Sequence, residues 1–229
     1  MAAAVLFDVD GTLVDSVDLH AQAWREAFAH FGHDLPYEAV RSQIGKGGDQ
    51  LLPVFLSPSQ LASYGEELEA WRGDLYRREY LPLVRPLPRV RHLLQRVRRG
   101  GARVALASSC RREELAVYVG VLGVGDLLAA ATTADDVGRS KPHPDVFLAC
   151  LRRLGVPAHQ AVAVGDSPYD AEAAGGAGVL TVGLLCGGFD PDDLRGAGVA
   201  ALYRDPSDLL ERYDASPLAG AGTPEQPGA

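Results

Sequence analysis

Apolar strands and amphipathic helices alternate along most of this chain, and no other feature of the sequence restricts the fold as strongly. Short apolar segments have the length and composition of buried strands at 3–7, 103–109, 128–133, 161–167 and 179–185. Apolar residues at helical spacing separate the later segments, at 112–122 and 144–154. Buried strands joined by helices are typical of a parallel sheet covered on both faces. We therefore predict an α/β fold.

A long helical stretch interrupts this alternation after the first strand. About 70 mostly helical residues precede the next strand, whereas connections in parallel sheets are usually far shorter. We therefore predict a core of residues 1–14 and 85–214 and an inserted helical cap of residues 15–84 over the carboxyl edge of the strands, where ligands bind in such sheets. Residues 215–229 are rich in Pro, Gly and Ala, and we expect a disordered tail.

Composition and charge exclude several classes of protein. The chain has 47% hydrophobic and 23% charged residues, which suits a self-supporting globular core. A net charge of −8 argues against nucleic acid or anionic lipid as a partner. We find no targeting segment and no membrane span, and three cysteines without metal-ligand spacing indicate a reducing compartment. We expect a cytoplasmic protein, a monomer or weak homodimer.

Polar residues follow the predicted strands at the point where each strand ends. Because parallel strands bring their carboxyl ends to one edge, these residues should form one site: Asp8, Asp10, Ser108, Ser109, Lys141, Asp166 and Asp170. Carboxylates suit Mg²⁺, while a lysine and a hydroxyl can hold phosphoryl oxygens. A carboxylate can also act as nucleophile, and a second one two residues away can act as general acid and base. The inventory indicates phosphoryl transfer.

The same residues resemble the sequence motifs of the haloacid dehalogenase superfamily. They stand in the expected order as Asp8-Val9-Asp10-Gly11-Thr12, Ser108 in ALASS, Lys141 in SKPHPDVF, and Gly165-Asp166-Ser167-Pro168-Tyr169-Asp170. The chain looks like the helical-capped group that contains phosphoglycolate phosphatase and β-phosphoglucomutase. The resemblance implies a Rossmann-like, doubly wound core, obligatory Mg²⁺ and an aspartyl-phosphate intermediate.

The resemblance also implies a role for each motif residue. Asp8 is then nucleophile and metal ligand, and Asp10 is acid/base and a ligand through its backbone carbonyl. Ser108 and Lys141 bind the phosphoryl group. Asp166 completes the metal site, and Asp170 helps directly or through water.

Other candidates for substrate binding carry a simpler alternative. The predicted substrate contacts are Thr12, Ser109, Lys46, His20 and Arg111. His20 lies on an apolar helix face, where a packed histidine is common, and the glycines around Lys46 can serve only to turn the loop. Ser109 can cap the following helix, and Arg111 can be merely exposed.

Three functions are compatible with these residues. The first is a phosphatase of small phosphorylated metabolites, and the second is a β-phosphoglucomutase-like phosphomutase. The arginine that holds a second phosphate in that mutase is not evident here, where Gly47, Gly48 and Asp49 stand. The third is a catalytically silent binding module, which the intact set of acidic residues and Lys141 disfavours. Dehalogenation is disfavoured because Asp10 and Thr12 fit the phosphoryl-transfer form of the first motif.

Overall fold

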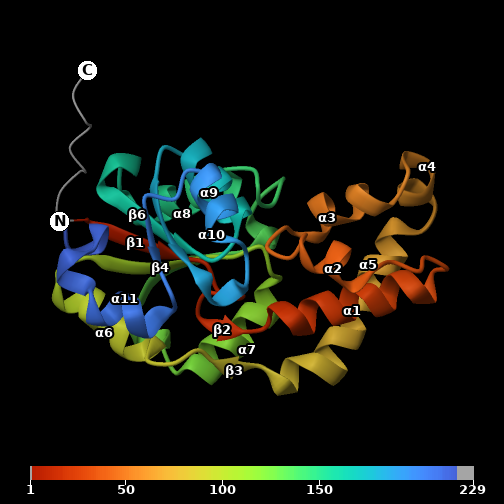
Figure 1. Ribbon diagram of the computed structural model, residues 1–229, viewed down its shortest axis with the longest axis horizontal. Coiled ribbons are helices and arrows are strands. Elements are labelled where there is room, and N and C mark those ends of the chain that lie inside the picture. Colours follow the sequence, from red (N-terminus) through yellow and green to blue (C-terminus); the bar gives the residue numbers. More distant parts are fainter. Residues whose placement is uncertain (1, 221–229) are drawn as a thin grey trace.

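The centre of the molecule is a six-stranded parallel sheet, which confirms the predicted fold class. The computed structural model describes residues 2–220 (Figure 1). The strands lie in the order β5-β4-β1-β6-β7-β8. Their bounds are β1 Ala4–Phe7, β4 Arg103–Ala107, β5 Leu128–Thr132, β6 Ala161–Gly165, β7 Leu180–Leu184 and β8 Ala201–Tyr203.

Helices cover both faces of this sheet because its strands present apolar side chains to both sides. One buried cluster joins the sheet to α6 (Val90–Arg99), α7 (Arg112–Leu122) and α11 (Pro206–Glu211). A second joins the opposite face to α8 (Asp145–Leu154) and α9 (Pro168–Gly176). A further short helix, α10, spans Pro191–Gly196. The two clusters make the doubly wound core that the resemblance implied.

A separate helical unit stands beyond one edge of the core (Figure 1). Its helices are α1 Val17–His30, α2 Tyr37–Arg41, α3 Gly48–Phe55, α4 Pro58–Gln60 and α5 Glu66–Leu75, with further short helical turns at Leu61–Gly65, Tyr76–Tyr80 and Leu81–Leu83. It has its own apolar cluster, which includes Trp24, Phe28 and Leu51. The chain enters and leaves through the antiparallel strands β2 (Val14–Asp15) and β3 (Arg85–Pro86), close to the predicted boundaries of the cap. Those boundaries stay a prediction.

The strand register sets the position of the site. Phe7, the last residue of β1, pairs with Leu106 of β4 on one side and with Val164 of β6 on the other. The segments that follow β1, β4 and β6 therefore start next to one another. The chain runs from β1 to β4 on one side and returns to β6 on the other, so the strand order reverses there, as at ligand sites in open α/β sheets.

The expected disordered tail is wrong for the residues nearest the core. Pro217–Ala219 form a short 3-10 helix, and Leu218 is 1% exposed within the apolar cluster under α6 and α11. The low apolar content of the segment gave no sign of this turn, because a single buried leucine is enough to anchor it. Residues 221–229 lie outside the described residues. Within residues 2–220, no helix has both the length and the apolar character needed to cross a membrane.

Candidate active site

Three carboxylates converge beyond the ends of the central strands. Asp8 follows β1, Asp166 follows β6, and Asp170 lies in the first turn of α9; each is at most 5% exposed. One ligand oxygen from each lies within 4.8 Å of the others. Like charges buried this closely repel one another unless a cation joins them. The structure thus brings together three of the residues that we predicted as metal ligands.

Lys141 brings a positive charge to this cluster. Its side chain is fully buried, and its Nζ contacts Asp8 and lies 2.7 Å from Asp170 Oδ1. Burial works to lower the pKa of this ammonium, but the charges of Asp170 and Asp8 outweigh burial and raise the pKa. Lys141 therefore stays charged and is held against the predicted nucleophile.

Local capping places Asp170. Ser167 is the N-cap of α9 and Pro168 its first residue, a common pair at helix starts. The backbone N–H and hydroxyl of Ser167 donate to Asp170 Oδ2 at 3.1 and 2.6 Å. These bonds leave Oδ1 directed at Lys141. Asp170 thus both takes part in the cap of α9 and contributes an oxygen to the acidic cluster.

Glycines form a close cradle around Asp166. A Cβ on Gly11 would lie 2.3 Å from Asp166 Oδ2, and one on Gly187 would lie 1.8 Å from it. Gly11 also has a φ of 77°, in the left-handed region that favours glycine. Thr12 Oγ1 donates to Asp166 Oδ1 at 2.7 Å. The DGT turn therefore holds the distant carboxylate in place.

The cluster fits a hard divalent cation. Burial, opposed in part by Lys141 and reinforced by Asp170 and Asp10, raises the pKa of Asp8 to about 8. Burial together with Asp170 and Asp8 raises the pKa of Asp166 well above its ordinary value. A bound cation would favour the ionised carboxylates, whose oxygens are ligands that Mg²⁺ prefers. The three carboxylates lie close enough to share one ion, and the single charge of Lys141 does not balance all of them. Both features suit a divalent cation.

The carboxylate of Asp10 lies outside this cluster and faces the cap. Its Oδ1 accepts from Ser16 Oγ at 2.7 Å and lies 2.8 Å from His20 Nε2. Burial opposes ionisation, but the charge of His20 and hydrogen bonds from His20, Ser16 and Tyr118 outweigh it and lower the pKa of Asp10 to about 2. The side chain of Asp10 is thus free of the metal cluster. The ligand role of its backbone carbonyl stays a prediction.

The hydroxyl residues divide between support and the cavity. Thr12, predicted as a substrate contact, instead donates its hydroxyl to Asp166. Ser108 is fully buried after β4, and its Oγ accepts from the backbone N–H of Cys110 at 3.1 Å. Ser109 lines the cavity, and its buried Oγ has no hydrogen-bond partner among residues 2–220. Ser109 therefore has the free hydroxyl that a substrate contact needs.

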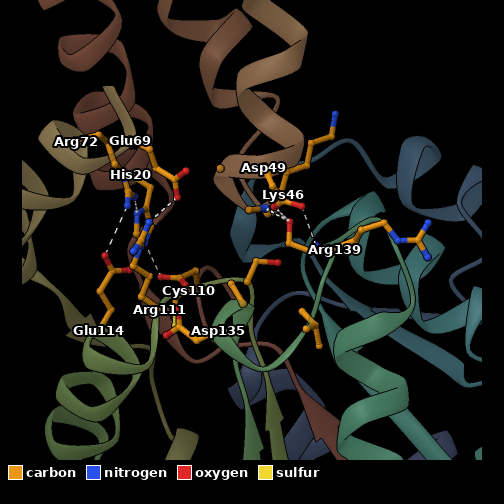
Figure 2. Close-up of a pocket in the computed structure, with 18 of the residues that line it drawn as sticks. His20, Lys46, Asp49, Glu69, Arg72, Cys110, Arg111, Glu114, Asp135 and Arg139 are labelled. Atoms are coloured by element: carbon orange, nitrogen blue, oxygen red, sulfur yellow. Dashed lines mark hydrogen bonds and ion pairs between the residues drawn. The ribbon is translucent and has the colours of Figure 1, made fainter. Parts of the chain in front are cut away.

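A cavity of about 270 Å³ lies between the cap and the core (Figure 2), and Asp8 is one of the residues that line it. The core contributes Asp8, Asp10 and Ser109 to its wall, and the cap contributes His20 and Arg72. His20 stacks on Tyr76, with ring centroids 4.1 Å apart. The histidine is therefore packed and directed at Asp10. Its role as a substrate contact stays a prediction.

The other predicted cap and rim contacts are engaged with the protein. Lys46 Nζ donates to Gln43 Oε1 at 2.6 Å and lies 4.6 Å from the ring centroid of Tyr169, directed away from the other labelled side chains (Figure 2). Arg111 donates to Glu69 Oε1 at 3.0 Å. Both residues line the cavity, but their charged ends already have partners.

Sequence reasoning missed a polar wall of the cavity. Arg72 is 9% exposed and Glu114 2%, and their charged groups lie 3.6 Å apart across the two units. Arg72 lies over the rings of Trp24 and Tyr76. Nothing in the spacing of these residues along the chain separates them from ordinary surface charges, since their burial comes from the contact of cap and core.

Comparison with known proteins decides the family. The family model described as haloacid dehalogenase-like hydrolase matches residues 5–184. The chain belongs to the haloacid dehalogenase-like hydrolases. The matched residues include Asp8, Lys141 and Asp166. The resemblance inferred from the motifs is confirmed.

Named relatives of this hydrolase are phosphatases. Phosphoglycolate phosphatase of Yersinia pseudotuberculosis is 33% identical over 80% of this chain and 81% of its own length. Fructose-1-phosphate phosphatase of Escherichia coli is 28% identical over 79% of this chain and 95% of its own length. The crystal structure of a hydrolase from Pseudomonas syringae has a TM-score of 0.86 at 30% identity, covering 93% and 98%. A putative β-phosphoglucomutase from Bacteroides vulgatus has a TM-score of 0.84 at 21% identity over 96% and 90%, and shows the fold alone. The prediction of a phosphatase is confirmed.

Proposed function

We propose that this hydrolase is a Mg²⁺-dependent phosphatase of small phosphorylated metabolites that works through a phosphorylated Asp8. The observation that carries the proposal is the position of Asp8. It lines the cavity between cap and core, is paired with buried Lys141, and has an oxygen within 4.8 Å of two further carboxylates. A nucleophilic carboxylate beside a cation and a metal site is the arrangement that phosphoryl transfer requires.

The proposed reaction has two displacement steps. A carboxylate oxygen of Asp8 bonds to phosphorus, the bond from phosphorus to the alcohol oxygen breaks, and Asp10 gives that oxygen a proton. Water then bonds to phosphorus while Asp10 takes a proton from it, and inorganic phosphate leaves Asp8. Lys141 holds a phosphoryl oxygen throughout. Ser108 and Ser109 are the hydroxyl residues that the sequence predicts at the same site as Lys141.

Asp10 needs both protonation states in this cycle. Its pKa of about 2 keeps the free carboxylate ionised, which is the state that activates water. The negative charge of a bound phosphate next to Asp10 raises this pKa and so favours the protonated state needed first.

Asp8, Asp166 and Asp170 would hold the Mg²⁺, with the backbone carbonyl of Asp10 as a further ligand. When bound, the ion offsets negative charge on the phosphoryl oxygens and on the three carboxylates.

The substrate class follows from the size of the cavity and from the relatives. About 270 Å³ suits a small metabolite, and the named relatives act on phosphoglycolate and fructose 1-phosphate. We therefore propose a phosphoglycolate-like or sugar-phosphate-like substrate. The proposal also keeps the predicted cytoplasmic location and the monomer or weak homodimer.

A phosphomutase is the weaker alternative because the arginines of the cavity wall already have acidic partners. Arg111 pairs with Glu69, Arg72 with Glu114, and Arg139 with Asp145. A mutase must hold a second phosphate in the cavity, which needs a cation that is not neutralised in this way.

The test is hydrolysis of phosphomonoesters by the wild-type protein and by Asp8→Asn, with and without Mg²⁺. We expect Mg²⁺-dependent release of phosphate by the wild type and none above background from Asp8→Asn. Full activity of the variant would exclude Asp8 as nucleophile. Incubation with β-glucose 1-phosphate and a trace of bisphosphate separates the alternatives, since only a mutase makes glucose 6-phosphate.

A further inference from the structure

The cap touches the core through a glycine-rich loop, residues 45–49, whose sequence the proposed reaction does not explain. The loop lies at the cavity and ends at Asp49, at the start of α3 (Figure 2). Its partner in the core is Ser140, a residue that is 3% exposed and directly precedes Lys141. The loop therefore reaches the segment that positions the buried ammonium.

The contacts between the loop and Ser140 form a reciprocal set. The backbone N–H of Ser140 donates to Asp49 Oδ2 at 3.0 Å, and the Ser140 hydroxyl donates to Asp49 Oδ1. The backbone N–H of Gly47 donates to Ser140 Oγ at 3.0 Å. We call this set, of Gly47, Asp49 and Ser140, the loop clamp. All of its bonds join cap to core.

The glycine at position 47 is required by the closeness of this contact. A Cβ there would lie 2.3 Å from Ser140 Oγ and 2.8 Å from Asp49 Oδ1. The φ of Gly47 is −78°, which any residue adopts, so the backbone itself does not demand glycine. The demand comes from the approach of the loop to Ser140.

We infer that Asp49 is a positioning residue that holds the cap closed over Asp8 and fixes the backbone next to Lys141. The inference rests on the proposed function, because Lys141 matters for turnover only if Asp8 is the nucleophile. Both oxygens of the Asp49 carboxylate bind one core residue. Closure is therefore stabilised within the protein and does not depend on a second anionic group in the substrate. This suits a substrate with a single phosphate.

The clamp also explains a feature of the sequence. The carboxylate at position 49 stands in the region where a mutase would carry a phosphate-binding arginine. In this chain Asp49 binds Ser140 of the core instead, so this loop of the cap closes the site through a contact with the protein and not with a phosphate.

The test compares two variants that break the clamp with two matched controls. Asp49→Ala removes the acceptor, and Gly47→Ala adds a methyl group that displaces Ser140. Glu67→Ala removes an exposed acid from the same unit, and Gly120→Ala adds a methyl group where nothing lies within 4 Å. Steady-state kinetics with a phosphomonoester and Mg²⁺, thermal unfolding, and amide hydrogen exchange are measured for each.

We expect kcat to fall about fivefold to thirtyfold in Asp49→Ala and Gly47→Ala, while KM changes less than about threefold. The lower part of that range reflects the exposure of Asp49, because water weakens its hydrogen bonds. Asp49→Asn, which keeps one acceptor oxygen, should recover part of the loss. Exchange at the amide of Ser140 should become faster in both clamp variants, while the unfolding temperature falls by no more than a few degrees.

An unchanged kcat or unchanged exchange at Ser140 in Asp49→Ala would overturn the inference, as would an equal loss in Glu67→Ala. The proposed function fails in a different way. If the wild-type protein hydrolyses no phosphomonoester, the exchange at Ser140 still decides whether the clamp exists.

Discussion

Lys141→Met is the sharpest test of the charge balance at the strand ends. The methionine keeps much of the side-chain volume but removes the charge that faces Asp8 and Asp170. Breaking a buried ion pair by removing one partner costs about 3–5 kcal/mol. For a chain of 229 residues, this lowers the unfolding temperature by on the order of 10 °C.

The loss should depend on pH in a defined direction. The folded state raises the pKa of Asp8 to about 8 and that of Asp166 well above its ordinary value. Between the ordinary pKa of an aspartate and these raised values, the folded protein therefore holds more protons than the unfolded chain. Stability of the metal-free protein therefore falls as pH rises from about 4 towards 8. Lys141 lowers both pKa values, so its removal raises them and extends this fall to higher pH. We expect the loss of stability in the variant to be larger at pH 8 than at pH 5.

The assay is thermal unfolding of the metal-free proteins at pH 5 and pH 8, followed by circular dichroism. Lys46→Met is the matched control, because Lys46 is the other lysine of the chain and is half-buried at the cavity. It should lose no more than about 1 kcal/mol. A Lys141→Met protein as stable as the wild type, with the same pH dependence, would refute the reasoning.

Two further predictions concern Asp166 and Asp10. Gly187→Ala places a Cβ 1.8 Å from Asp166 Oδ2 and should weaken Mg²⁺ binding at least tenfold by titration calorimetry, whereas Gly196→Ala, with nothing within 4 Å, should not change it. His20→Asn removes the charge and hydrogen bond that lower the pKa of Asp10, so burial should raise that pKa above about 2. The acid limb of the kcat/KM profile should then move to higher pH, and an unmoved limb would contradict the assignment of Asp10.

The residues at the strand ends can be predicted because two features of the sequence determine where they lie. The apolar runs locate the strands, and parallel pairing brings their carboxyl ends to one edge. Asp8, Asp166 and Asp170 needed no further information to be placed together, and the structure has them within 4.8 Å. Lys141 is predicted from the resemblance of SKPHPDVF to the family motif.

The cap residues were less predictable because their partners lie far away in the chain. Lys46 and Arg111 line the cavity as expected, yet their charges are directed at Tyr169 and Glu69. No periodicity shows which of many surface charges will pair across the contact of cap and core. The turn at residues 217–219 was missed for the same reason, since its anchor is a single leucine in a distant site.

The pairing of Arg111 with Glu69 offers a direct test of why this cavity should prefer one phosphate. Glu69→Gln keeps the shape of the side chain but removes the charge that neutralises Arg111. The freed guanidinium can then bind a second phosphate, so a sugar bisphosphate should inhibit about threefold to tenfold more strongly, while KM for a monophosphate stays unchanged. Glu67→Gln, on the exposed face of the same helix, is the control. Equal inhibition of both variants and the wild type would mean that paired charges do not select against a second phosphate.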